Sequence, residues 1–104
     1  MIMENWTQEQ YAARLQEMKQ EAHDKMWLYI EVNAKEFMNE CEPGVKNLAN
    51  CCKAMLDAML EGDGFIVEPK IRTKVAGTLT VRYYVDNLHL GRRKYADVMK
   101  EQQQ

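Results

Sequence analysis

The stretch Gly62-Asp63-Gly64 divides the sequence into two parts that differ in both periodicity and charge. Up to Gly64, apolar residues recur at helical spacing, and six Lys and Arg stand against twelve Asp and Glu, a net charge of −6. From Phe65 onward the spacing is typical of strands, and eight bases stand against four acids, a net charge of +4. This asymmetry indicates either a charged partner or pairing between the two halves.

The composition predicts one domain that spans residues 1–104, because a chain of 104 residues with 46% hydrophobic and 29% charged residues is long enough for one compact core. Its first residues lack the basic and apolar regions of a signal peptide, and no stretch approaches the roughly 20 apolar residues of a membrane span. We therefore expect a cytoplasmic protein without a membrane partner.

The helical part is predicted over residues 7–61, and its start is marked by a capping box. Thr7 stands three residues before Gln10, and Trp6 and Tyr11 occupy the two positions of a hydrophobic staple. The first helix should therefore begin at Gln8.

From Tyr11 to Cys41, apolar residues recur every three or four positions, which predicts one long helix or two abutting helices. A break near residues 23–25 would also fit, because the apolar surface broadens just afterwards. The turn at Pro43-Gly44 precedes a second helix, expected from Val45 to a stop at Gly62.

A β-hairpin is predicted over residues 65–86, with a three-residue loop at 76–78. This register pairs Val75 with Leu79, Thr73 with Val81, Ile71 with Tyr83 and Pro69 with Val85, and it gathers apolar residues on one face. The opposite face then carries Lys70, Lys74 and the directly opposed Arg72 and Arg82. Like charges in that position are unfavourable and suggest an anion nearby. A C-terminal helix is predicted over residues 91–101.

The expected fold class is α+β, and the order of helices, turn, helix and hairpin resembles a winged helix. The resemblance rests on element order, and it implies a recognition helix that begins at Val45 and a wing at the hairpin tip. Phosphates and base edges are the natural targets of the bases and amides on these elements. The candidate nucleic-acid-binding residues are Lys46, Asn47, Asn50, Lys53, Lys70, Arg72, Lys74, Arg82, Arg92, Arg93 and Lys94.

The alternative hypothesis is a protein-interaction module: a homodimer, an adaptor, or an inhibitor that presents acidic helices to a nucleic-acid-handling protein. The basic hairpin could equally meet an acidic protein surface. Trp27, Leu28, Tyr29 and Met38 are the candidate interface anchors, because aromatic residues and methionine are enriched in interface cores.

No motif predicts catalysis, a cofactor or a metal site. The sequence contains no serine, and His23 and His89 lie outside the spacings of zinc ligands. Cys41, Cys51 and Cys52 are expected as small buried residues and not as disulfide partners. The acidic pairs Glu17/Glu21 and Glu36/Glu40 are interpreted as solvated helix faces, and Met18, Met26, Met55 and Met59 as core.

Overall fold

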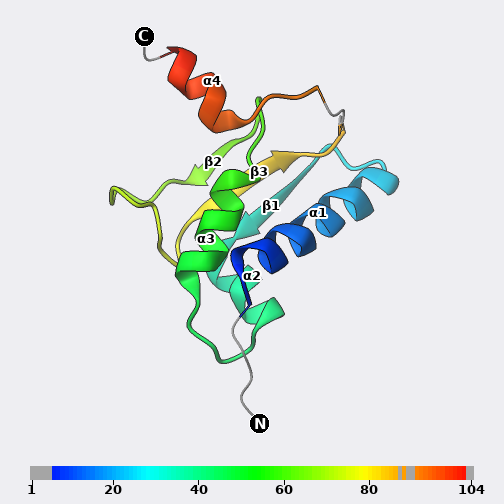
Figure 1. Ribbon diagram of the computed structural model, residues 1–104. Coiled ribbons are helices and arrows are strands. Elements are labelled where there is room, and N and C mark those ends of the chain that lie inside the picture. The colour runs from blue at the N-terminus through cyan, green and yellow to red at the C-terminus, as the bar shows by residue number, and fades with distance from the viewer. Residues whose placement is uncertain (1–5, 87, 89–90, 103–104) are drawn as a thin grey trace.

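The structure, a computed structural model, describes residues 6–86, 88 and 91–102, with only the backbone at 101 and 102. The described part contains four helices and a three-stranded antiparallel sheet, which confirms the α+β class (Figure 1). In chain order these elements are α1 (Gln8–Asp24), β1 (Tyr29–Asn33), α2 (Ala34–Cys41), α3 (Leu48–Asp57), β2 (Gly64–Val67), β3 (Thr80–Tyr84) and α4 (Tyr95–Gln102).

The sheet has the strand order β1-β3-β2, and α1 and α3 lie over one of its faces while α4 stands at one end (Figure 1). On the covered face, Val81 and Tyr83 of β3 are fully buried, and their neighbours Thr80, Arg82 and Tyr84 are only partly buried. This alternation is typical of a sheet that packs helices on one side and leaves the other side open. Burial of the apolar face is the main stabilising contribution.

Helix α1 begins where the capping box predicts. The Thr7 hydroxyl accepts a hydrogen bond from the Gln10 amide (3.2 Å), and the Gln10 side chain accepts one from the Thr7 amide (2.8 Å). The rings of Trp6 and Tyr11 pack with centroids 5.3 Å apart, as expected of a hydrophobic staple. The prediction of a start at Gln8 is confirmed.

The break expected near residues 23–25 is confirmed, since α1 ends at Asp24, but the predicted helical continuation is wrong over residues 29–33, where a strand follows. Met26 has a left-handed φ of 64°, and the Trp27 amide donates back to the Ala22 carbonyl (3.0 Å), which closes the helix. Ile30 and Val32 then face the core from β1, while Tyr29 and Glu31 are exposed. The spacing of apolar residues in this segment fits both a helix and a strand: Ile30 stands four residues after Met26, as in a helix, and two residues before Val32, as in a strand.

The predicted hairpin register is also wrong, although β2 and β3 do pair in antiparallel fashion. Gly64 lies opposite Arg82 and Phe65 opposite Val81, so neither Thr73 nor Ile71 has a place in the sheet. The opposed Arg72/Arg82 pair therefore does not exist. β3 is the central strand, with β1 on its other edge, and the sheet is completed without the segment 68–79. Pro69, which cannot donate to a ladder, lies two residues after the end of β2.

The bounds of two helices differ from the predictions as well. α3 begins at Leu48 and not at Val45, and it ends at Asp57, before the stop predicted at Gly62. α4 spans Tyr95–Gln102 and not residues 91–101. Residues 92–94 lie before the helix, and Lys94 pairs with Leu60 in a single antiparallel bridge.

The Gly62-Asp63-Gly64 stretch is held by a buried ion pair. The Asp63 carboxylate accepts hydrogen bonds from the amides of Leu60 (2.9 Å) and Tyr84 (2.8 Å) and from the Arg92 guanidinium (3.0 Å). Arg92 also donates to the carbonyls of Tyr84 (2.9 Å) and Glu61 (2.8 Å). These contacts join the end of α3, the sheet and the chain that leads to α4.

Candidate functional site

Helix α3 exposes only a narrow stripe of side chains to solvent. Cys51, Cys52, Ala54 and Met55 are buried against α1, α2 and the sheet, and the solvent-exposed stripe one turn apart consists of Ala49, Lys53 and Asp57. Lys46 lies exposed just before the helix, in the connection from α2. Gly44 in this connection has a φ of 77°, which glycine adopts without strain.

The segment 68–79, between β2 and β3, folds back against α3. The Cys52 thiol contacts the Ala76 carbonyl (3.5 Å), and Gly77 lies close to Lys35 of α2. Lys70, Ile71 and Arg72 are exposed at its outer part. Ile71 keeps 51% of its surface exposed between the two bases.

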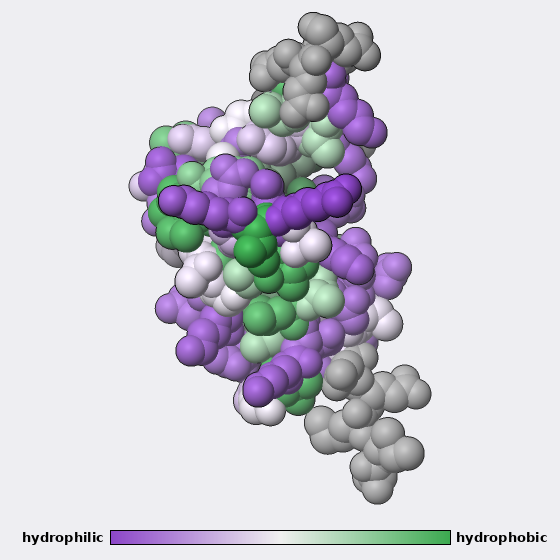
Figure 2. Space-filling model, turned by 90° about the vertical axis from the view of Figure 1, so that its left-hand side faces the viewer, coloured by the Kyte–Doolittle hydropathy of each residue, from purple (hydrophilic) through white to green (hydrophobic). Residues whose placement is uncertain are grey.

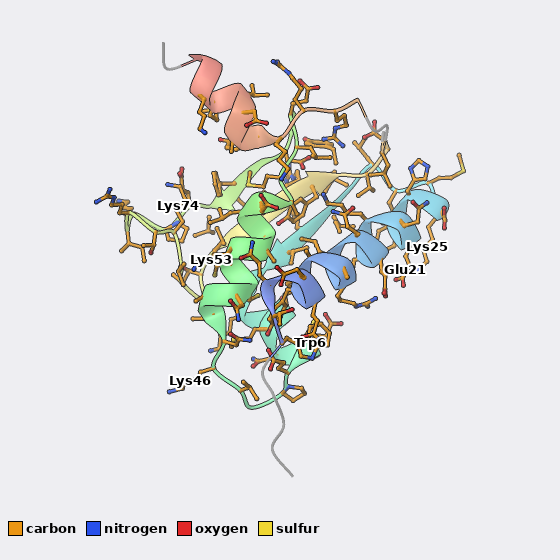
Figure 3. All side chains as sticks on the ribbon, in the orientation of Figure 1. Trp6, Glu21, Lys25, Lys46, Lys53 and Lys74 are labelled. Atoms are coloured by element: carbon orange, nitrogen blue, oxygen red, sulfur yellow. The ribbon has the colours of Figure 1, made fainter. Side chains whose placement is uncertain are left out.

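Five of the predicted nucleic-acid-binding residues are brought together by this arrangement: Lys46, Lys53, Lys70, Arg72 and Lys74. Lys46, Lys53 and Lys74 lie on one side of the molecule, along α3 and the segment 68–79 (Figure 3). We call these five residues the basic face. Viewed from this side, a strip of hydrophobic side chains is bordered on both sides by hydrophilic ones (Figure 2).

Within the basic face, only Lys74 has an ion pair among the described residues, with Glu68 at 3.0 Å. Lys46, Lys53, Lys70 and Arg72 have none in the described part of the chain. Their charges are therefore available to an external anion.

The remaining predicted bases are engaged inside the protein. Arg82 donates to Glu31 across the β1–β3 pair (2.6 Å) and lies 4.4 Å from the centroid of the Tyr29 ring. Arg92 holds Asp63, while Arg93 and Lys94 pair with acids that precede Gly64, namely Glu61 (3.7 Å) and Asp57 (3.2 Å). Opposite charges that join the two halves thus account for part of the asymmetry noted in the sequence.

The two predicted amides, Asn47 and Asn50, serve the fold. Both donate to the Trp6 carbonyl, at 2.8 and 3.1 Å, and Asn47 also donates to Glu42 (2.8 Å). Neither side chain is free to read a base edge in this conformation.

Glu42 is a structural carboxylate in the turn between α2 and α3, and sequence analysis gave it no role. It accepts hydrogen bonds from the Tyr11 hydroxyl (2.5 Å), the Asn47 amide and the Trp6 amide (3.0 Å). Burial raises its pKa, but these three donors outweigh burial and hold the pKa below its usual range. Glu42 therefore stays ionised and fixes the chain before α1 to the turn that precedes α3.

The predicted protein-interface anchors divide into two groups. Trp27, Leu28 and Tyr29 are exposed at the corner between α1 and β1. Met26 beside them is 91% exposed, so the prediction that it is a core residue is wrong. Met38 is buried in the core and is not available as an anchor. Met55 and Met59 are core residues, as predicted, whereas Met18 is partly buried.

Neither a metal site nor an ionised cysteine is found in the described part of the chain. No group of three or more His, Cys, Asp and Glu side chains there is placed to hold a metal ion, and His89 lies outside that part. The three cysteines are free thiols, and burial raises the pKa of Cys51 to about 12. Cys51 is therefore a protonated, buried thiol at neutral pH.

No family model, curated protein or solved structure matches this chain. Function is therefore inferred from the geometry of this molecule. Among the described residues, no helix has the length and apolar content needed to cross a membrane.

Proposed function

We propose that this protein binds duplex DNA through the basic face, in the manner of a winged helix. The element order α1-β1-α2-α3-β2-β3 supports this proposal. In this reading α2 and α3 form the helix-turn-helix, α3 is the recognition helix, and the segment 68–79 is the wing.

The observation that carries the proposal is where the unpaired bases lie. Lys46 stands just before the recognition helix and Lys53 on it, and Lys70 and Arg72 stand on the wing. In contrast, acids of the protein itself hold Arg82, Arg92 and Lys94. Phosphate contacts by lysine and arginine supply most of the affinity of a DNA-binding protein and position it on the duplex.

Sequence readout on this surface is limited. Ala49 can contact a thymine methyl group and Lys53 can reach a guanine, but Asn47 and Asn50 are occupied and Asp57 is paired with Lys94. We therefore propose binding that is dominated by phosphate contacts and has modest sequence preference.

The test measures fluorescence anisotropy of a labelled duplex in about 0.1 M salt, with single charge reversals. Lys53→Glu and Arg72→Glu should each weaken binding by roughly fivefold or more, because each loses a phosphate contact and adds repulsion. Combining the two should abolish measurable binding.

Lys25→Glu is the matched control, because it makes the same charge change on the side of the molecule away from the basic face (Figure 3). It should leave DNA affinity unchanged within about twofold, since exposed charges beyond the Debye length of roughly 10 Å are screened. If all three variants weaken binding equally, or if the unmodified protein shows no binding, the basic face is not a DNA-binding surface.

A further inference from the structure

Strand β1 forms an edge of the sheet, and part of its backbone is unpaired. The Val85 amide donates to the Leu28 carbonyl (2.9 Å) and the Ala34 amide to the Leu79 carbonyl (2.8 Å). In an antiparallel pair of strands, every second residue exchanges hydrogen bonds with the neighbouring strand. Leu28 and Ala34 are such residues, so Ile30 and Val32 between them also direct their amides and carbonyls toward β3. Those of Tyr29 and Glu31 point to the free edge, where another strand can pair.

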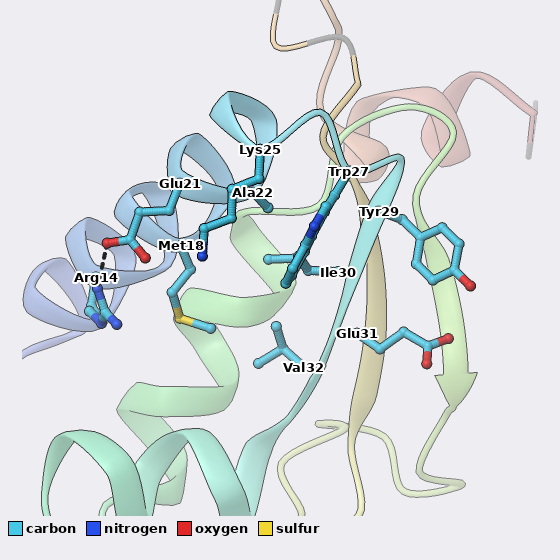
Figure 4. A pocket seen from close by; sticks show the side chains of 10 residues that line it. All are labelled: Arg14, Met18, Glu21, Ala22, Lys25, Trp27, Tyr29, Ile30, Glu31 and Val32. Atoms are coloured by element: carbon cyan, nitrogen blue, oxygen red, sulfur yellow. Dashed lines mark ion pairs between the residues drawn. The ribbon is translucent and has the colours of Figure 1, made fainter.

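A trough runs beside this edge, between β1 and α1 (Figure 4). Met18 and Ala22 form its wall on α1, and Trp27, Ile30 and Val32 approach it from the other side. The hollow has a volume of about 420 Å³. A smaller hollow of about 80 Å³, which shares Met18 and Val32 with it, continues past Asn33 to Glu36 and Glu40. The trough therefore follows the length of β1.

The two ends of the trough carry opposite charges. Lys25 stands at the Trp27 end, with its ammonium 5.4 Å from the centroid of the indole, and Glu36 and Glu40 stand at the Asn33 end. None of the three has an ion pair within the described residues. The charged side chains between them have partners within the chain: Arg14 pairs with Glu17 (3.2 Å) and Glu21 (3.5 Å), and Glu31 pairs with Arg82 (2.6 Å).

We propose that the β1 edge binds an extended segment of another protein by strand addition. The segment pairs antiparallel to β1 through the backbone of Tyr29 and Glu31, and aliphatic side chains on its inner side enter the trough. An antiparallel segment begins at the Asn33 end of β1, so a basic residue at its start meets Glu36 and Glu40, and an acidic residue at its end meets Lys25.

The occupant is a peptide of another protein and not a second copy of the chain because α1 forms the other wall of the trough along the same edge (Figure 4). A lone strand fits beside that wall. In a second copy, Ile30 and Val32 already pack in that copy's own core, so its β1 has no inner side chains to place in the trough.

The experiment uses the full chain and the peptide acetyl-Lys-Thr-Val-Thr-Leu-Thr-Glu-amide, in which Lys, Val, Leu and Glu share the face that enters the trough. Amide hydrogen exchange is read residue by residue. Binding should slow exchange at the Tyr29 and Glu31 amides by roughly tenfold or more, while the Ile30 and Val32 amides are already protected by β3. A peptide with its Lys and Glu exchanged is the matched ligand control and should bind about fivefold more weakly.

Two protein variants separate this surface from the basic face. Lys25→Glu should weaken peptide binding by about fivefold and leave DNA affinity unchanged, and Lys53→Glu should do the reverse. Unchanged exchange at Tyr29 and Glu31 with saturating peptide would overturn the proposal. Slow exchange at both amides in the free protein, together with a dimer in sedimentation, would also overturn the proposal, because a second copy would then be paired with the β1 edge.

Discussion

Lys19 is a buried lysine in the middle of α1, with 1% of its surface exposed. Its ammonium donates to the Ala58 carbonyl (2.7 Å) at the end of α3 and lies 4.7 Å from the centroid of the Tyr83 ring. Burial lowers the pKa of Lys19 to about 8; the Asp63 carboxylate opposes this shift and the Arg92 guanidinium adds to it. The protonated form is therefore less stable in the folded protein than in the unfolded chain.

This shift predicts that the free energy of unfolding rises with pH just above neutrality. The unfolded chain, with a Lys19 pKa near 10.5, holds its proton while the folded protein releases it, so the penalty is fully present below pH 8 and declines above it. Between pH 7 and pH 9 this contribution of Lys19 should amount to about 1 kcal/mol. The buried thiols oppose it within the same interval, because burial raises the pKa of Cys51 and Cys52 above the ordinary value of 9.0. The thiols titrate in Lys19→Met as well, so the contribution is measured in urea denaturation as the difference between the unchanged protein and that variant.

Lys19→Met keeps the length of the side chain and removes the titrating group. Its free energy of unfolding should not rise over the same pH interval. An equal rise in both proteins would show that another group is responsible.

At the scale of elements, local signals were read correctly from the sequence and long-range ones were not. The start of α1 follows from Thr7 and Gln10, which lie three residues apart and contact one another. Cys51, Cys52 and Met55 are buried as their helical spacing predicts. In contrast, β1 is a strand because β3, some 50 residues later, pairs with it, and nothing within residues 29–33 decides between the two periods.

The candidate site was predicted to the same limited extent. Sequence analysis selected the residues of the basic face by residue type and predicted element. Lys46, Lys53 and Lys74 lie on one side of the molecule (Figure 3), and Lys70 and Arg72 belong to the same segment as Lys74. Sequence analysis could not separate them from Arg82, whose acidic partner Glu31 is 51 residues away in the chain. The hairpin register failed for the same reason, because it was chosen without the second neighbour of β3.

The end of α1 offers a prediction about an element boundary. Met26 adopts a φ of 64°. This conformation is unfavourable for any residue with a Cβ atom and is free of strain for glycine. The Met26 side chain is 91% exposed, so its removal loses little packing. Met26→Gly should therefore raise the free energy of unfolding by about 0.5–1 kcal/mol in chemical denaturation. Met26→Ala retains the Cβ and should give no such gain. Equal stability of the two variants would contradict this account of the helix end.

At the scale of the whole molecule, charges of the two halves meet inside one domain. Among the residues that the structure describes, four ion pairs join an acid that precedes Gly64 to a base that follows it: Glu31–Arg82, Asp57–Lys94, Glu61–Arg93 and Asp63–Arg92. Only the last is buried, at 0% and 9% side-chain exposure. The asymmetry of the sequence is therefore partly cancelled within the fold, and what remains of the positive charge in the second half lies largely on the wing.

Salt should therefore act very differently on folding and on DNA binding. The exposed ion pairs contribute about 0–1 kcal/mol each and the Asp63–Arg92 pair is little screened, so the free energy of unfolding should change by less than about 1 kcal/mol between 0.05 and 0.5 M NaCl.

DNA affinity should fall steeply over the same range, because each of Lys46, Lys53, Lys70, Arg72 and Lys74 can displace one counterion. A plot of log affinity against log salt should have a slope no steeper than about −4.5, and Arg72→Glu should make it shallower by about 1. A slope near zero would remove phosphate contacts from the mechanism, and a much steeper one would require bases beyond the basic face.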